Sequence, residues 1–155
     1  MKIARIDIDE ASLSAPTDQA EHERKVAIFD LIERNSFTPD GAAEAGSDGP
    51  FDLRLALEDN RLVFDITGPS FMRRILLSLS PFKLLLRDYR MICESYYDAL
   101  KNATPAQIES IDMGRRGVHN EGAELLTERL AGKVAIDHET ARRLFTLVNA
   151  LHIRA

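Results

Sequence analysis

Apolar and polar residues alternate in four segments of the chain, and this two-residue period predicts four β-strands. The segments are residues 2–9, 51–57, 61–66 and 71–80. Glu58 to Asn60 separate the second segment from the third, and their composition is typical of a hairpin turn. The fourth segment follows Gly68-Pro69 and is predicted as the third consecutive strand, although its leucines and arginines also fit a helix.

Apolar residues spaced three and four positions apart predict helices elsewhere. The first begins at Thr17 and Asp18, which are good N-cap residues, and runs to about Asn35. The second begins at Ser80-Pro81 and carries an apolar stripe over five turns, which indicates a central core helix. Its stripe consists of Phe82, Leu85, Leu86, Tyr89, Ile92, Cys93, Tyr96 and Leu100.

Glycines are expected to divide the C-terminal part of the chain. Thr104 to Gln107 form a capping box that begins a helix, and Gly114 and Gly117 interrupt this helix in a turn. A further helix is expected over residues 122–131, a short strand over 134–136, and a last helix after Asp137 as its N-cap. The stripe of this last helix is Ala141, Leu144, Phe145, Val148 and Leu151.

Together these elements predict a single α+β domain over residues 1–155. A small, mainly antiparallel sheet of about four strands is covered by the long central helix, residues 81–101, and by the C-terminal helices. Residues 38–50, TPDGAAEAGSDGP, combine three glycines and two prolines with three acids, and we expect them to form a flexible loop. A chain of 155 residues is long enough to bury a core without disulfides.

Composition narrows the class of protein. The formal net charge of −5 argues against a general nucleic-acid coat, and the single cysteine rules out an internal disulfide. No apolar run is long enough for a signal peptide or a membrane span, which favours a cytoplasmic protein of bacterial type. Residues 113–155 carry a charge of +2 against −7 for residues 1–112, and this asymmetry permits an anionic ligand in the C-terminal part.

Four blocks of the sequence are specific: EHERKVAIFDLIERNSF, LSLSPFKLLLRDYRMICESYYDAL, TPAQIESIDMGRRGVHNEGAELL and ETARRLFTLV. In these blocks the chain resembles a small UPF-type family of uncharacterised cytosolic proteins from alphaproteobacteria. The resemblance covers nearly the whole chain except residues 38–50, which are longer and richer in glycine and alanine here. Because that family has no established activity, the resemblance implies a compartment and a class of protein and carries over no catalytic residue.

The segment with the most chemistry is IESIDMGRRGVHN, residues 108–120. We expect the Gly-Arg-Arg-Gly sequence at 114–117 to form a corner between two helices. Glycines let a backbone approach an anion closely, and two guanidinium groups can grip phosphate or carboxylate bidentately. Alternatively, the corner has only a structural role, and its arginines form ion pairs with Asp112 and Glu121 of the same chain. The candidate ligand or partner contacts are Arg115, Arg116, His119, Asn120 and Glu121.

Two sharper hypotheses use the same corner. RNA-binding KH modules place a Gly-x-x-Gly loop between two helices, and the order helix, GRRG, helix, strand and helix imitates half of that arrangement. In the other hypothesis His119 acts as an acid–base group with Glu121 or Asp112, which requires these side chains to converge in a pocket. No other histidine or cysteine lies at ligand spacing on this segment, so neither a metal nor a cofactor is expected.

Three further groups of residues are most simply structural. Cys93 falls on the apolar stripe of the central helix, where we expect it to be buried and inert. Glu94 and Tyr97 either line a cleft with the corner or lie on a solvated face. His22 belongs to the charged sequence Glu21 to Lys25, which fits a solvated first helical turn.

The sequence contains no phosphate-binding loop, dinucleotide fingerprint, paired-cysteine metal knuckle or nucleophile elbow. We therefore expect a non-catalytic module for protein interaction or regulation, with an unknown protein partner that contacts residues 114–121. The alternatives are binding of a phosphate-bearing ligand or RNA at the 114–117 corner, and a small enzyme that uses His119. No membrane partner is expected, and the edge strand of a small sheet permits a homodimer.

Overall fold

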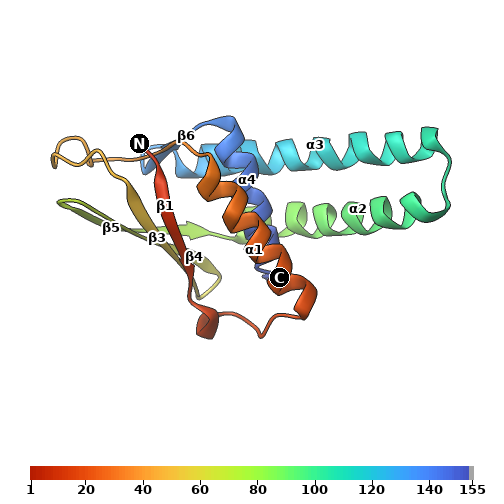
Figure 1. Ribbon diagram of the computed structural model, residues 1–155, viewed down its shortest axis with the longest axis horizontal. Coiled ribbons are helices and arrows are strands. Elements are labelled where there is room, and N and C mark those ends of the chain that lie inside the picture. The colour runs from red at the N-terminus through yellow and green to blue at the C-terminus, as the bar shows by residue number, and fades with distance from the viewer. Residues whose placement is uncertain (154–155) are drawn as a thin grey trace.

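The computed structural model of the protein describes residues 1–153, which combine two sheets with four α-helices (Figure 1). The main sheet contains β1 (Ile3–Ile8), β3 (Phe51–Glu58), β4 (Arg61–Gly68) and β5 (Phe71–Ser78). The strands lie in the order β1-β3-β4-β5, with β1 parallel to β3 and the other neighbours antiparallel. The predicted α+β class and the mainly antiparallel sheet of four strands are therefore confirmed.

The register of the main sheet follows from its alternating apolar residues. Phe64 of β4 lies opposite Leu55 of β3 on one side and Ile75 of β5 on the other, and all three side chains are buried. Asp59 and Asn60 connect β3 to β4, and both have positive φ, as a two-residue type I′ turn requires. A slip by one residue would turn this apolar set toward solvent, so burial fixes the pairing.

Side chains form hydrogen bonds with the backbone at both edges of the main sheet. On β1, the Ile3 N–H donates to Asn35 Oδ1 at 2.7 Å, and Asn35 Nδ2 donates to the Ile3 carbonyl at 3.0 Å. On β5, Lys133 Nζ donates to the Leu76 carbonyl at 3.2 Å. Within residues 1–153 no strand pairs with the outer side of β5, so a homodimer formed through this edge stays a prediction.

Four α-helices, two short 3₁₀ helices and a second sheet complete the chain. Two of the predicted helix starts show their caps directly: the Ala20 N–H donates to Thr17 Oγ1 at 3.1 Å, and the Thr140 N–H donates to Asp137 Oδ1 at 2.8 Å. The predicted capping box of Thr104 and Gln107 is also confirmed. The helices are α1 (Asp18–Glu33), α2 (Lys83–Asn102), α3 (Pro105–Leu130), α4 (His138–Ala150), η1 (Glu10–Ser12) and η2 (Ser80–Phe82).

The second sheet pairs β2 (Phe37–Pro39) with β6 (Val134–Ile136) in antiparallel orientation, which confirms the strand predicted over 134–136. β2 extends into the segment that we expected to form a loop, residues 38–50. Ala42 and Ser47 of that segment are buried. Part of it is therefore packed against the body of the protein, while its flexibility stays a prediction.

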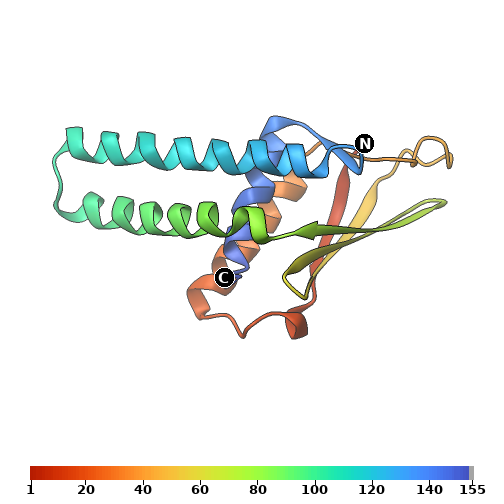
Figure 2. The ribbon, with the colours of Figure 1, turned by 180° about the vertical axis from the view of Figure 1, so that it is seen from behind.

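The helices form two groups in space. α1 and α4 pack on each other beside the main sheet, whereas α2 and α3 form an antiparallel hairpin that projects away from it (Figures 1 and 2). The near end of this hairpin joins the core through Phe82, Leu86 and Tyr89, which are buried. At its far end Leu100 is 51% exposed, so the predicted core stripe of α2 is wrong there because the hairpin extends beyond the body.

α3 runs as one helix through residues 114–117, so the predicted corner between two helices is wrong. Its glycines serve close packing instead: a Cβ on Gly114 would lie 2.9 Å from Ile92 Cδ1 of α2, and a Cβ on Gly122 would overlap the Phe145 ring of α4. The helix predicted over 122–131 is the C-terminal end of α3. The KH-like interpretation needs a loop between two helices and is therefore also wrong.

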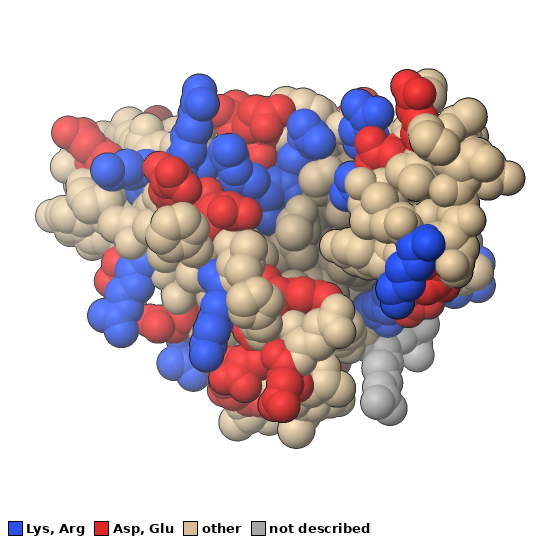
Figure 3. Space-filling model, turned by 45° about the vertical axis from the view of Figure 1, so that its right-hand side comes forward, with Lys and Arg blue, Asp and Glu red and all other residues tan. Residues whose placement is uncertain are grey.

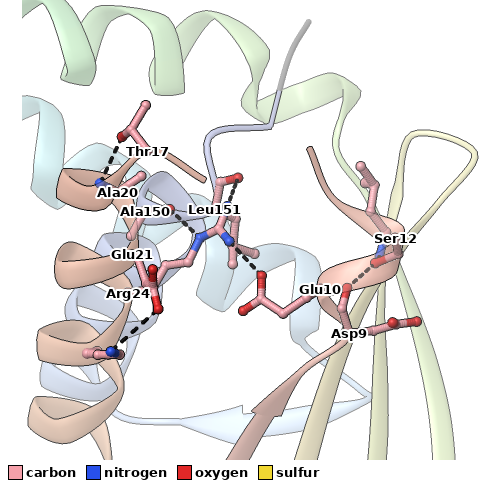
Figure 4. A network of polar contacts seen from close by, with 11 residues as sticks. Asp9, Glu10, Ser12, Thr17, Ala20, Glu21, Arg24, Ala150 and Leu151 are labelled. Carbon is pink, nitrogen blue, oxygen red and sulfur yellow. Dashed lines mark hydrogen bonds and ion pairs between the residues drawn. The ribbon is translucent and has the colours of Figure 1, made fainter. Parts of the chain in front are cut away.

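A buried arginine joins α1 to η1 and to the C-terminal end of α4 (Figure 4). Arg24 of α1 is only 3% exposed, and its Nε and Nη2 each donate at 3.0 Å, to the carbonyls of Ala150 and Leu151 respectively. Its Nη1 lies 3.0 Å from Glu10 Oε2 of η1. A cation is favourable at the C-terminal end of α4, where carbonyl groups lack partners within the helix. Arg24 thus fixes the position of α1 against α4.

Candidate functional site

A groove of about 330 Å³ lies between α1, α2 and α4, and we call it the α1–α2 groove. Figure 3 shows the hollow between the body of the molecule and the projecting hairpin. α1 and α4 pack closely on each other, whereas α1 and α2 stand apart and leave the groove open. Its lining residues are His22, Glu23, Val26, Ala27 and Asp30 of α1, Tyr89, Cys93 and Tyr97 of α2, and Thr146, Asn149 and Ala150 of α4.

The floor of the groove is apolar and its rim exposes large apolar side chains. Ala27 and Ala150 are buried at the bottom. Val26 is 45% exposed on one wall and Tyr97 is 59% exposed on the other. Phe29, three positions after Val26 on α1, is 66% exposed and extends the apolar surface beyond the rim. Nothing in residues 1–153 covers these side chains, and large exposed apolar side chains around a groove are typical of an interaction site.

The charged groups that line the groove are acidic. Glu23 and Asp30 lie seven positions apart on α1, which places them about two turns apart on the same side of the helix. The groove lining contains no lysine or arginine. Glu23 Oε2 lies 3.2 Å from His152 Nε2, and Glu23 Oε1 accepts a hydrogen bond from Gln19 Nε2 at 3.3 Å. The groove therefore presents negative charge above an apolar floor.

A second hollow of about 260 Å³ continues the groove toward the start of α1. Glu94 and Arg90 of α2 join its lining, together with Tyr97 and Asn149. Asn149 Oδ1 is buried and has no hydrogen-bond donor within the described part of the chain. A buried carbonyl oxygen without a donor costs free energy, so a ligand N–H group would be stabilised there if the Asn149 side chain turned this oxygen toward the hollow.

His119 lies behind the groove and supports its floor. Its ring stacks on the Tyr89 ring at 5.3 Å, and its Nε2 lies 2.9 Å from the Arg142 carbonyl and 3.0 Å from Thr146 Oγ1. Burial lowers the pKa of the His119 imidazole, so the ring is neutral at pH 7. The carbonyl can only accept a hydrogen bond, which indicates that Nε2 carries the proton. The ring holds Tyr89 in place between α3 and α4.

Cys93 and Tyr89 form the wall of the groove on the α2 side. Burial raises the pKa of Tyr89 to about 12 and also raises the pKa of the Cys93 thiol. Both groups are therefore protonated at neutral pH, and a protonated thiol is a weak nucleophile. Cys93 was expected to be buried and inert. It packs against the core but is only partly buried, because one side of the residue faces the groove.

The two arginines of the 114–117 segment both bind the same internal carboxylate. Arg115 Nε donates to Asp112 Oδ1 at 3.1 Å, and Arg116 Nη2 lies 3.2 Å from Asp112 Oδ2. The hydrogen bond from Arg115 lowers the pKa of the Asp112 carboxyl. The Arg115 guanidinium also lies over the Tyr96 ring, 4.6 Å from its centroid. This pairing is the one expected if the two arginines have a structural role. Each guanidinium group already has a partner within the chain.

The five residues predicted as contacts do not share one face of α3. At about 100° per residue, Arg115 and His119 point toward α2 and α4, Arg116 and Asn120 point to a second side, and Glu121 points to a third. No hydrogen bond in residues 1–153 joins His119 to Asp112 or Glu121, so the pairing that the acid–base hypothesis requires is not formed. Whether any of the five binds a ligand or partner stays a prediction.

Sequence reasoning found some residues of the groove and missed others. Glu94 and Tyr97 were considered for a cleft with the 114–117 segment, and they do line a hollow, but with α1 and α4. Val26, Phe29 and Asn149 were not singled out. The sequence contained one indication of Val26 and Phe29. Apolar residues surround α1 almost completely at residues 26–29, VAIF, and only one side of the helix can face the core, so the others are exposed.

Two other kinds of site are absent from residues 1–153. No helix there has both the length and the apolar character that are needed to cross a bilayer. No group of three or more His, Cys, Asp or Glu side chains there is arranged to hold a metal ion.

The family described as Uncharacterised protein family (UPF0262) matches residues 1–154 of the chain. The chain is similar to a UPF0262 protein of Phenylobacterium zucineum, with 58% identity over 153 residues that cover 99% of this chain and 94% of the relative. It is also similar to UPF0262 proteins of Caulobacter vibrioides, 60% identical over 153 residues with the same coverage, and of Rhodospirillum rubrum, 54% identical over 151 residues that cover 96% of this chain and 91% of the relative. No solved structure matches the chain. These similarities extend over nearly every residue and confirm the alphaproteobacterial resemblance: the chain belongs to the UPF0262 family.

Proposed function

We propose that the protein is a non-catalytic module that binds a protein partner through the α1–α2 groove. The observation that carries this proposal is the uncovered apolar rim made by Val26 and Tyr97 around an apolar floor, with the exposed Phe29 side chain beyond the rim. Exposed apolar side chains of this size are stabilised when a partner removes them from water, at about 25 cal/mol per Å² of apolar surface. The fold supplies no element that does so within residues 1–153.

The ionisable groups around the groove favour binding over chemistry. The Cys93 thiol and the Tyr89 hydroxyl hold their protons at neutral pH, and the His119 ring donates its Nε2 proton to the backbone of α4. A nucleophile needs an adjacent base, and a general base needs access to its substrate. These three side chains instead stabilise one another and the wall of the groove.

The groove is also well suited to recognition because its walls are held apart by structure that lies outside it. The buried Arg24 fixes α1 on α4, and the stacked His119 fixes Tyr89 of α2 against α4. A preformed site loses little conformational entropy on binding, so more of the interaction energy appears as affinity.

The proposal predicts that a charge placed in the rim abolishes partner binding. Tagged wild-type protein, Val26→Asp and Met72→Asp are recovered from cells of the protein's own organism, and the proteins retained at a fixed ratio are quantified by mass spectrometry. Met72 is the control because it is 80% exposed on the main sheet, away from the groove. We expect Val26→Asp to retain such partners at least tenfold less than the wild type, while Met72→Asp retains them fully.

Equal retention by the two variants and the wild type would contradict the proposal. Thermal unfolding of each variant accompanies the experiment, because Val26 and Met72 both face solvent and neither aspartate is expected to change the melting temperature by more than a few degrees. A loss of binding in Val26→Asp with an unchanged melting temperature therefore reports on the groove itself.

A further inference from the structure

We infer that the partner segment is an amphipathic helix that carries a lysine or arginine beside its apolar residues. This inference rests on the proposed function and names the chemistry that the α1–α2 groove selects.

The shape of the groove fits the side chains of one helical face. α1 and α2 form two roughly opposed walls, and α4 closes the bottom between them. A groove of about 330 Å³ is too small to enclose a helix, whose diameter with side chains is about 10–12 Å. It accommodates the apolar side chains that a helix presents at positions i, i+3 or i+4, and i+7, as in other complexes of helices bound in grooves.

The apolar contacts are distributed as such a face requires. Val26 stands on α1, Tyr97 stands on α2, and Ala27 and Ala150 leave a shallow floor between them. Phe29 lies outside the groove on α1, where it is exposed to a partner that extends beyond the rim. Small residues at the floor let an incoming leucine or methionine descend between the aromatic and aliphatic walls. Aromatic side chains at such a rim contribute most to binding because they bury large areas with few rotatable bonds.

The charge of the groove selects a basic partner. Glu23 and Asp30 line it about two turns apart, and no lysine or arginine lines it. An acidic segment would meet both carboxylates at short range, whereas a lysine or arginine beside the apolar residues would pair with one of them. Across the adjoining hollow Glu94 adds a third carboxylate, partly offset there by Arg90.

The Asn149 amide gives the cation a defined position when its side chain turns toward the groove, because its Oδ1 atom is buried in the unbound protein. This oxygen has no donor within the described residues, and Asn149 lines both the groove and the adjoining hollow beside Glu23 and Tyr97. An ammonium or guanidinium group has several N–H donors, so one group can serve the Asn149 oxygen and the Glu23 carboxylate together. The Tyr97 ring next to them offers a face that attracts the same cation.

The test uses two synthetic helical peptides of equal length with the same apolar positions. One carries lysine beside these positions and the other carries glutamate. Each is titrated into the full ¹⁵N-labelled chain, and amide shifts are followed by NMR. We expect the lysine peptide to shift the amides of Val26, Ala27, Tyr97 and Ala150, and the glutamate peptide to leave them unchanged.

A pair of charge-neutralising variants sharpens the test. Glu23→Gln combined with Asp30→Asn removes both carboxylates of the groove and is expected to raise the Kd of the lysine peptide at least tenfold. Glu124→Gln combined with Glu128→Gln removes two exposed carboxylates of α3 outside the groove and is expected to change that Kd less than twofold.

Equal binding of the two peptides, shifts confined to residues outside the groove, or no binding of the lysine peptide would each overturn the inference. The outcome is separable from that of the proposed function. If Val26→Asp loses its cellular partners while the lysine peptide fails to bind, the groove remains the contact surface and its preference for a basic helix is wrong. If Val26→Asp keeps its partners, the proposed function, binding of a protein partner through the groove, is wrong.

Discussion

Gly122 has no side chain at the point where the Phe145 ring of α4 lies against α3. Gly114 likewise leaves room for the Ile92 side chain of α2. Gly117 has no neighbour within 4 Å of the position that a Cβ would occupy. The three glycines of α3 therefore differ in their effect on the structure. Two of them permit neighbouring helices to approach, and the third only reduces the stability of the helix.

Alanine substitutions distinguish these roles. Gly122→Ala is expected to lower the free energy of unfolding by about 1–3 kcal/mol, because the new methyl group would overlap the Phe145 ring in a packed core. Gly117→Ala is expected to raise it by about 0.5–1 kcal/mol, because alanine restricts the unfolded chain and favours the helix. Urea unfolding of both variants measures the two changes. A stabilised Gly122→Ala protein would show that α4 does not pack where the structure places it.

At the scale of the elements, the beginnings of the helices depend on a few capping side chains. Asp137 precedes α4, and its carboxylate accepts a hydrogen bond from the Thr140 N–H at 2.8 Å. The hydrogen bonds to Thr140 lower the pKa of the Asp137 carboxyl. α4 forms the floor of the α1–α2 groove, so this cap also helps to position Thr146 and Asn149.

The Asp137 cap makes stability depend on pH. Its pKa is lowered in the folded state, so its contribution is fully present above the unfolded value of about 3.9 and is lost as the pH falls through the folded pKa. Asp137→Ala should cost about 1 kcal/mol at pH 7. We expect the difference between wild type and Asp137→Ala, measured by urea unfolding from pH 7 to pH 3, to shrink on acidification. A difference that stays constant would show that the carboxylate does not act as the cap.

At the scale of the whole molecule, two bodies meet at α4. The sheet and α1 lie on one side, and the α2–α3 hairpin projects on the other (Figures 1 and 2). Arg24 joins α1, η1 and the end of α4 through three contacts of 3.0 Å. Because the groove is bounded by both bodies, its width depends on how firmly α1 is held to α4.

Arg24→Ala is therefore expected to destabilise the protein by about 2–4 kcal/mol, since it leaves two carbonyl groups without their donor. The Glu10 carboxylate is exposed and adds little to this loss. Arg54→Ala is the control: Arg54 pairs with Asp9 at 3.6 Å on the surface, and its loss should cost less than about 1 kcal/mol. Denaturant unfolding measures both. Similar small losses in the two variants would mean that the Arg24 contacts do not hold α1 in place.

The sequence alone determined the elements whose causes are local. The alternation of apolar residues fixed the strands of the main sheet, and the positive-φ pair Asp59 and Asn60 fixed their hairpin. Thr17, Thr104 and Asp137 marked the starts of three helices, because a cap acts on amide groups only two or three residues away. These signals lie within a few residues of the structures that they specify.

Only the tertiary structure decided the continuity of α3 and the location of the candidate site. A glycine in a helical pattern can mark a turn or a close approach, and the choice depended on Phe145, a residue more than twenty positions away. The groove brings Val26, Tyr97 and Asn149 together from three helices. Their separations in sequence carry no period that a local pattern could reveal. Such a site forms because α1, α2 and α4 pack around one core, and that packing sums many weak contacts between distant segments.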